Sequence, residues 1–125
     1  MKRIFTILIL AFMVASFTYA QSIDAVVSAI KSSNASQVAK YFDNTVEMTL
    51  PGKSSSFSKT QAEVVLKDFL ANNQVKDIVV IHKGENSGNQ YYIGTLVTKA
   101  GNFRTTIYMK QRGDAQVLQE LKFER

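Results

Sequence analysis

Two long segments of the chain carry apolar residues at helical spacing. Between residues 22 and 31 the apolar positions recur every three or four residues, at Ile23, Val26, Val27 and Ile30, as in a helix with one buried face. A longer segment follows Ser58, which with Gln61 forms a capping box, and ends at Asn72-Asn73. Its apolar positions are Ala62, Val65, Leu66, Phe69 and Leu70. Each segment therefore predicts an amphipathic helix.

A short helix, a strand and a loop are predicted between these two helices. Asn34 begins a capping pattern for a helix that runs to Phe42. From Val46 to Leu50 apolar and polar residues alternate, which predicts a half-buried strand. Pro51-Gly52 closes that strand, and we expect the polar segment Lys53 to Ser56 to be a loop.

In the second half of the chain, apolar and polar residues alternate with a period of two. Four strands are predicted, at about 76–83, 90–99, 102–112 and 115–124. Their connections are short and contain Gly, so consecutive strands should pair antiparallel. One side of the last two strands carries Phe103, Ile107, Met109, Val117, Leu121 and Phe123. We therefore expect an α+β domain in which one face of an antiparallel sheet packs against helices.

Residues 1–20 have the pattern of a secretory signal peptide. Lys2 and Arg3 precede an apolar run from Ile4 to about Phe17, and Thr18 and Ala20 supply the small residues of a cleavage signal. The run is too short and wrongly flanked for a membrane span. We expect export to the periplasm or the cell exterior, with no stable membrane anchor. The mature chain, residues 21–125, should form a single domain of about 105 residues.

Composition narrows the classes of function. The chain has no Cys, which excludes disulfides, thiolate metal sites and a lipid anchor on Cys. The formal net charge of +5 falls to about +3 when the signal peptide is removed, and the basic residues are scattered, so we expect no nucleic-acid binding. One His and dispersed carboxylates give no metal-ligand cluster. No cofactor motif is present, and we expect no cofactor.

Four segments carry a resemblance to a known family: YFDNTVEMTLPG, FSKTQAEVVLKDFLANN, HKGENSGNQYYIGTLVTKAGNFRTTIYMK and LQELKFE. They resemble small exported bacterial proteins of unknown function with the nuclear-transport-factor-2-like fold, also called cystatin-like or SnoaL-like. The resemblance implies the order helix, helix, strand, helix and four strands, with a curved antiparallel sheet wrapped around helices. It supplies no catalytic residue, and the wider fold includes isomerases, dehydratases, transport adaptors and assembly domains.

His82 is the main candidate for chemistry in such a cone. In a regular strand His82 would lie on the same face as Ile78 and Val80, which would turn the imidazole toward the helices. Both faces of this segment are apolar, so the alternation does not decide which face is buried. In an isomerase-like or dehydratase-like enzyme, His82 would exchange protons with an acid or base. The candidate partners are Asp43, Tyr41, Glu47 and Tyr91. The alternative is a hydrogen-bonded structural His.

Three further residues are candidates for a ligand site with His82. Gln119 shares parity with Leu121, and Thr105 lies on the predicted core face. Each would either line a polar cavity or be satisfied within the core. Phe69 would supply an apolar wall for a small apolar ligand.

These patterns favour a non-enzymatic exported module that binds a small apolar molecule in the cone or a protein partner on the sheet. Whether a homodimer forms through the sheet face stays open: Tyr91 or Tyr92 and Tyr108 would place aromatic surface there, but the other outward residues are mostly polar. The alternatives are the small acid-base enzyme and an assembly domain without a pocket.

Overall fold

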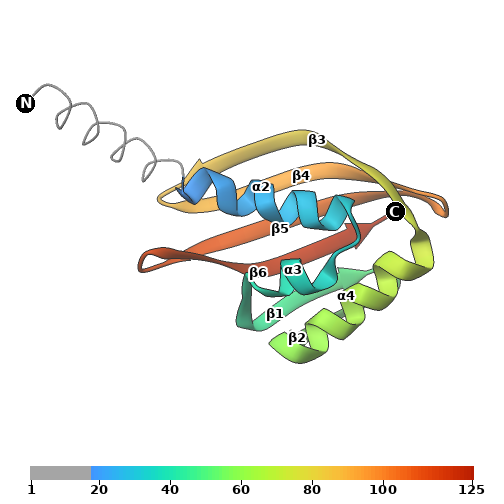
Figure 1. The fold of residues 1–125 in the computed structure, drawn as a ribbon, viewed down its shortest axis with the longest axis horizontal. Helices are drawn as coiled ribbons and strands as arrows, with labels where there is room; N and C mark the ends of the chain where they lie inside the picture. Colours follow the sequence, from blue (N-terminus) through green and yellow to red (C-terminus); the bar gives the residue numbers. More distant parts are fainter. Residues whose placement is uncertain (1–17) are drawn as a thin grey trace, which may run out of the picture.

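The computed structural model describes residues 18–125 (Figure 1). The helices are α2 (Thr18–Lys31), α3 (Ala35–Ala39) and α4 (Lys59–Asn73). The strands are β1 (Phe42–Leu50), β2 (Lys53–Ser58), β3 (Val75–Asn86), β4 (Asn89–Thr98), β5 (Gly101–Arg112) and β6 (Ala115–Glu124). The predicted signal peptide lies outside the described residues except for its last three, which begin α2. Within residues 18–125, no helix is long and apolar enough to cross a membrane.

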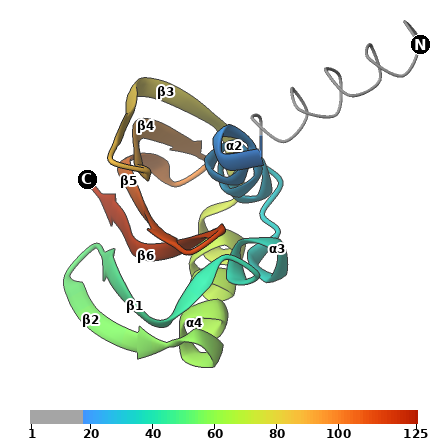
Figure 2. The same cartoon turned by 90° about the vertical axis from the view of Figure 1, so that its left-hand side faces the viewer.

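The strands form one curved sheet in the order β2-β1-β6-β5-β4-β3. All neighbours are antiparallel except β1 and β6, which are parallel. Figure 2 shows the three helices on one side of this sheet. The predicted α+β fold, with helices against one face of a curved antiparallel sheet, is therefore confirmed.

The helices divide the inner face of the sheet between them. Helix α2 lies against β3 and β4, and α4 lies against β1 and β2. At the centre, the Phe69 ring stacks on Phe123 with centroids 4.6 Å apart and meets Phe103 edge-on at 5.2 Å. These three rings fill the middle of the core, where dispersion and the removal of apolar area from water stabilise the fold.

The predicted helix caps are present. The Asn34 side chain accepts a hydrogen bond from the Gln37 amide, and Ser58 accepts one from the Gln61 amide at 3.3 Å. The short helix nevertheless ends at Ala39 rather than at Phe42, because Phe42 is the first residue of β1 and is buried in the core.

The segment predicted as a loop is a strand. Residues 53–58 form β2, which pairs antiparallel with β1 along its whole length. Almost all of β2 is exposed, so its two sides do not differ in polarity and the period of two is absent from its sequence. Pairing with β1, rather than burial, makes this segment a strand.

Two irregularities in strand pairing reverse the predicted side of two candidate residues. In β6, Glu120 pairs with Tyr108 and Leu118 with Met109, so Gln119 is an extra residue. In β3, Val80 pairs with Gly94 and His82 with Ile93, so Ile81 is extra.

Each extra residue forms a β-bulge, which shifts the alternation by one position. The prediction that Val117 and Gln119 share the core side with Leu121 is therefore wrong, and Gln116 and Leu118 are buried instead. His82 likewise lies on the opposite face from Val80.

Candidate functional site

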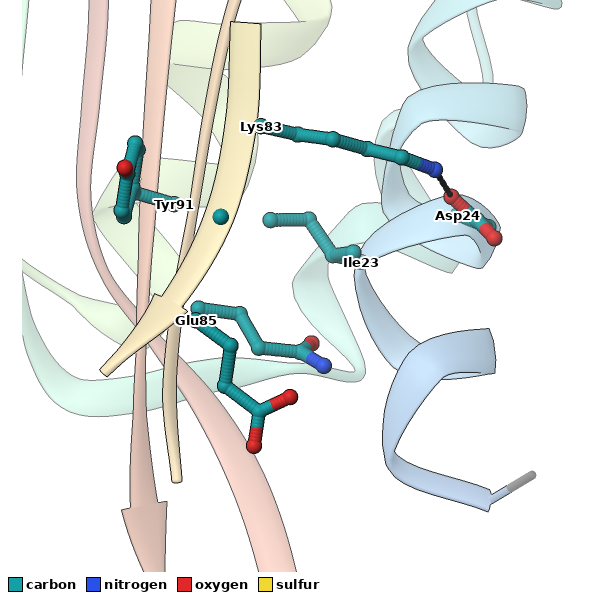
Figure 3. A pocket seen from close by; sticks show the side chains of 7 residues that line it. Ile23, Asp24, Lys83, Glu85 and Tyr91 are labelled. Atoms are coloured by element: carbon teal, nitrogen blue, oxygen red, sulfur yellow. Dashed lines mark hydrogen bonds and ion pairs between the residues drawn. The ribbon is translucent and has the colours of Figure 1, made fainter. Parts of the chain in front are cut away.

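A cavity of about 230 Å³ opens between α2 and the paired ends of β3 and β4. Figure 3 shows this cavity from close by. Its lining residues come from three elements and are Ile23, Asp24, Lys83, Gly84, Glu85, Gln90 and Tyr91. This volume is below the range of about 300–1,000 Å³ typical of ligand pockets, so the cavity suits only a very small molecule.

One edge of the cavity is bridged by an ion pair. Lys83 Nζ of β3 lies 3.4 Å from Asp24 Oδ1 of α2 (Figure 3). Both side chains are more than half exposed, so the pair contributes little stability. The ion pair instead keeps the two charged groups in place beside the opening of the cavity.

Gln90 is the buried polar residue of the cavity. It occupies an inward position of β4, where it pairs with Met109 of β5, and only 5% of it is exposed. Its side-chain oxygen is buried and accepts no hydrogen bond from the described residues. A buried acceptor without a partner is costly, and this oxygen has less than 1 Å² of accessible surface, so the cavity does not expose it. The neighbouring wall is apolar, since Ile23 is almost fully buried.

His82 lies outside this cavity. It is exposed, and its Nε2 lies 3.0 Å from the Tyr91 hydroxyl. Figure 3 shows the Tyr91 ring on the far side of β3 from Ile23 and Asp24. The imidazole therefore contacts one of its predicted partners, Tyr91, but on the outer face of the sheet, and the expectation that it turns toward the helices is wrong because of the bulge at Ile81.

Asp43 belongs to a separate cluster that joins β1, β5 and β6. Its Oδ2 accepts hydrogen bonds from Arg112 Nη2 at 2.9 Å and from Gln119 Nε2 at 3.2 Å, and its Oδ1 accepts one from the Asn44 amide. Burial alone would raise the pKa of Asp43, but the hydrogen bonds from Asn44 and Gln119 and the charge of Arg112 outweigh it, so the pKa is lowered below 3.8.

The predicted acid-base pair of His82 with Asp43 is therefore not formed. The partners of Asp43 are Arg112, Gln119 and Asn44. Tyr41, the other predicted partner, is half-buried beside the core, and its carbonyl accepts a hydrogen bond from the Leu118 amide.

The other predicted ligand residues lie in the core or in the Asp43 cluster. Phe69 packs among core rings, and Thr105 is fully buried with a hydroxyl that has no hydrogen-bond partner in the described part of the chain. Gln119 is held by Asp43. None of the three is among the residues that line the cavity between α2 and β3–β4.

Apart from Tyr91, which was a candidate partner of His82, sequence reasoning missed the residues that line the cavity. Residues 84–89 were expected to be a turn, but β3 continues to Asn86 and brings Lys83 and Glu85 beside α2. Gln90 could have been found from the alternation in β4, because it lies on the same side of the strand as Tyr92 and Leu96, which is the inward side.

The one-sided curved sheet with its helices defines the nuclear-transport-factor-2-like, or cystatin-like, class of fold. The family model described as a domain of unknown function, DUF4783, matches residues 23–124. The chain belongs to that family. No curated protein matches it.

Solved structures agree with this assignment. A DUF4783 family protein from Bacteroides uniformis ATCC 8492 is 26% identical, with a TM-score of 0.78 over 82% of this chain and 94% of that one. One from Bacteroides ovatus ATCC 8483 is 26% identical, with a TM-score of 0.77 over 81% of this chain and 92% of that one. An NTF2-like protein of unknown function from Cytophaga hutchinsonii ATCC 33406 is 8% identical with a TM-score of 0.62, covering 85% of this chain and 88% of that one, and shares the fold.

Proposed function

We propose that this protein is an exported, non-enzymatic module that binds a small molecule in the cavity between α2 and the ends of β3 and β4. The observation that carries the proposal is the cavity itself, whose wall includes the buried polar side chain of Gln90 on β4 and the apolar side chain of Ile23 on α2. The Gln90 side chain would supply the polar part of that wall. The apolar side chain of Ile23 next to it would cover the rest of a small ligand.

The test is native mass spectrometry of the protein purified from the exported fraction. We expect a reproducible extra mass on a chain that begins at Gln21. Gln90→Leu should lose that mass. The matched control is Gln116→Leu, because Gln116 is equally buried at 6% exposure and has a side-chain oxygen without a partner, yet lies outside the cavity. An empty wild-type protein, or retention of the extra mass by Gln90→Leu, would contradict the proposal.

A second candidate function is self-association through the β3 edge of the sheet. Three consecutive apolar residues are strongly exposed there: Val79 at 50%, Val80 at 52% and Ile81 at 64%. The strand is the last in the sheet order, so its outer backbone groups have no strand partner among the described residues. An exposed apolar edge strand favours pairing with another strand, and a second copy of the chain would offer an identical edge for twofold pairing.

This candidate is tested by measuring molar mass with light scattering after size exclusion at several concentrations. We expect a dimer that Val80→Lys converts to a monomer. Val64→Lys is the matched control, since Val64 is exposed to a similar extent, 56%, but lies on α4. A monomeric wild-type protein, or equal loss of the dimer in both variants, would refute this assignment.

A further inference from the structure

The edge strand β3 carries a charged residue on each side of its exposed apolar residues 79–81. Lys76 precedes them and Glu85 follows them. Both side chains are exposed, and neither forms an ion pair within residues 18–125. In an antiparallel pair of identical strands, the start of one strand lies beside the end of the other. A second copy of β3 would therefore bring Glu85 toward Lys76 at both ends of the apolar segment.

The bulge at Ile81 limits how two copies of β3 can align. Before the bulge, Val79 pairs with an outward residue of β4, and after it His82 and Gly84 do the same. Two residues that lie directly opposite each other in an antiparallel pair project to the same side of the sheet. Val79 can therefore lie opposite His82 or Gly84 of the second copy. It cannot lie opposite Lys83, which pairs with an inward residue of β4.

The alignment with Val79 opposite Gly84 gives poor neighbours. It would set the carboxylate of Glu85 opposite the apolar Ile78, and the ammonium of Lys83 opposite Val80. Each charge would lose water to an apolar side chain without gaining a partner, which is unfavourable.

The alignment with Val79 opposite His82 gives matched neighbours. Glu85 then lies opposite Lys76, and Val80 lies opposite Ile81. Because the pairing is twofold, each of these contacts occurs twice. Opposite charges and apolar side chains both stabilise a strand pair when they face their own kind of partner.

The other edge of the sheet offers no comparable partner. Strand β2 ends the sheet opposite β3 (Figure 1), is half as long and is mostly Ser and Lys, with no exposed apolar segment. Pairing of β3 with β2 would bury little apolar area and would leave a free edge on each copy, so that chains could grow without closing. The matching edge for β3 is therefore the β3 of a second copy.

We propose that two copies of this protein pair antiparallel through β3, with Val79 opposite His82 and Glu85 opposite Lys76, so that their sheets become continuous. This inference rests on the second candidate function, self-association through the β3 edge, and specifies its register. The apolar contacts supply most of the affinity, whereas the exposed charge pairs contribute less and chiefly fix the alignment.

The first test reverses the charges and measures the dissociation constant of the dimer by light scattering at several concentrations. Lys76→Glu and Glu85→Lys should each weaken the dimer about tenfold, because two symmetric charge pairs become repulsive. The combined variant restores opposite charges and should return to within about threefold of wild type. Lys67→Glu is the control, because it changes the net charge equally at an exposed position of α4.

The second test uses the absence of Cys from the chain. Mild oxidation of a mixture of the Val79→Cys and His82→Cys proteins should give a disulfide between the two, since directly opposite residues are within bonding range. A mixture of the Val80→Cys and Lys83→Cys proteins is the matched control. Its two positions are equally far apart in sequence but would be opposite only in the rejected alignment, so we expect little cross-linking.

The outcomes separate the register from self-association itself. A wild-type protein that is monomeric at every concentration would overturn both. A dimer that Val80→Lys dissociates would keep self-association, but the register fails if Lys76→Glu leaves its affinity unchanged, if the combined variant is no tighter than the single variants, or if the Val80→Cys and Lys83→Cys mixture cross-links faster.

Discussion

At the scale of single residues, Gly84 permits the contact between His82 and Tyr91. A Cβ added at Gly84 would lie 2.5 Å from the Tyr91 hydroxyl oxygen and 2.6 Å from the adjacent ring carbon. Such distances are far shorter than van der Waals contact, so any larger residue would displace the ring. The absence of a side chain at this one position therefore lets the Tyr91 ring lie across β3.

Gly84→Ala should break the His82–Tyr91 contact while leaving the fold stable. The clash involves the end of a side chain, which can rotate outward, so we expect a loss of under about 1 kcal/mol in the free energy of unfolding. Nuclear Overhauser effects between the two rings should disappear. Tyr91→Phe is the matched control, because it removes the hydroxyl and keeps the ring in place. Persistence of the ring-to-ring signals in Gly84→Ala would show that the packing around Gly84 is different.

Asp43 should make stability depend on pH in the acid range. Its pKa is lowered in the folded protein, so its contribution to stability is present above the unfolded value near 3.8 and is lost as the pH falls through the folded pKa. The free energy of unfolding in urea, measured between about pH 6 and about pH 2.5, should fall less steeply for Asp43→Asn than for wild type. Parallel curves for the two proteins would mean that the Arg112 and Gln119 contacts do not stabilise the charged form.

At the scale of elements, the caps of the helices are local contacts that substitution can isolate. Ser58→Ala removes the acceptor for the Gln61 amide at the start of α4. We expect it to lower the free energy of unfolding by about 1 kcal/mol. Ser56→Ala is the control, since Ser56 is an exposed residue of β2 that caps no helix. Equal effects of the two substitutions on the urea midpoint would contradict the capping role.

The bulges of β3 and β6 explain why the alternation along the strand predicted the wrong face of the sheet for two candidate residues, His82 and Gln119. In a regular strand, the side of each residue follows from its neighbours in sequence. A single extra residue puts the alternation on its two sides out of step. In β3 the extra residue Ile81 reverses the side of His82, and in β6 Gln119 is itself the extra residue. The extra residue is defined by pairing with another strand, which no pattern within β3 or β6 reveals.

At the scale of the whole molecule, stability depends on the contact of α4 with the centre of the sheet. Phe69 brings the helix against Phe103 of β5 and Phe123 of β6. Phe69→Ala should therefore lower the free energy of unfolding by about 3 to 5 kcal/mol, through lost burial and the cavity left behind.

The comparison is Val64→Ala on the same helix, where the side chain is exposed and the expected change is within about 0.5 kcal/mol. Both values come from urea unfolding followed by circular dichroism. A small effect at Phe69 would mean that the core repacks around the lost ring or that α4 contributes little to stability.

Elements whose signals are short-range could be predicted from the sequence alone. Helix spacing, the caps at Asn34 and Ser58, and the alternation in β5 depend on residues within a few positions of one another, and these predictions were confirmed. The family resemblance supplied the class of fold, which the family model and solved structures bear out.

Which side chains share a cavity could not be predicted from the sequence, because it depends on how the chain folds. Gln90 on β4, Glu85 on β3 and Ile23 on α2 line one space, although more than sixty residues separate Ile23 from the other two. Strand β2 likewise exists because β1 lies beside it. In both cases the deciding contact is between segments distant in sequence, and the physical reason is that cross-strand register and packing against a helix are set only when the sheet has curved around its core.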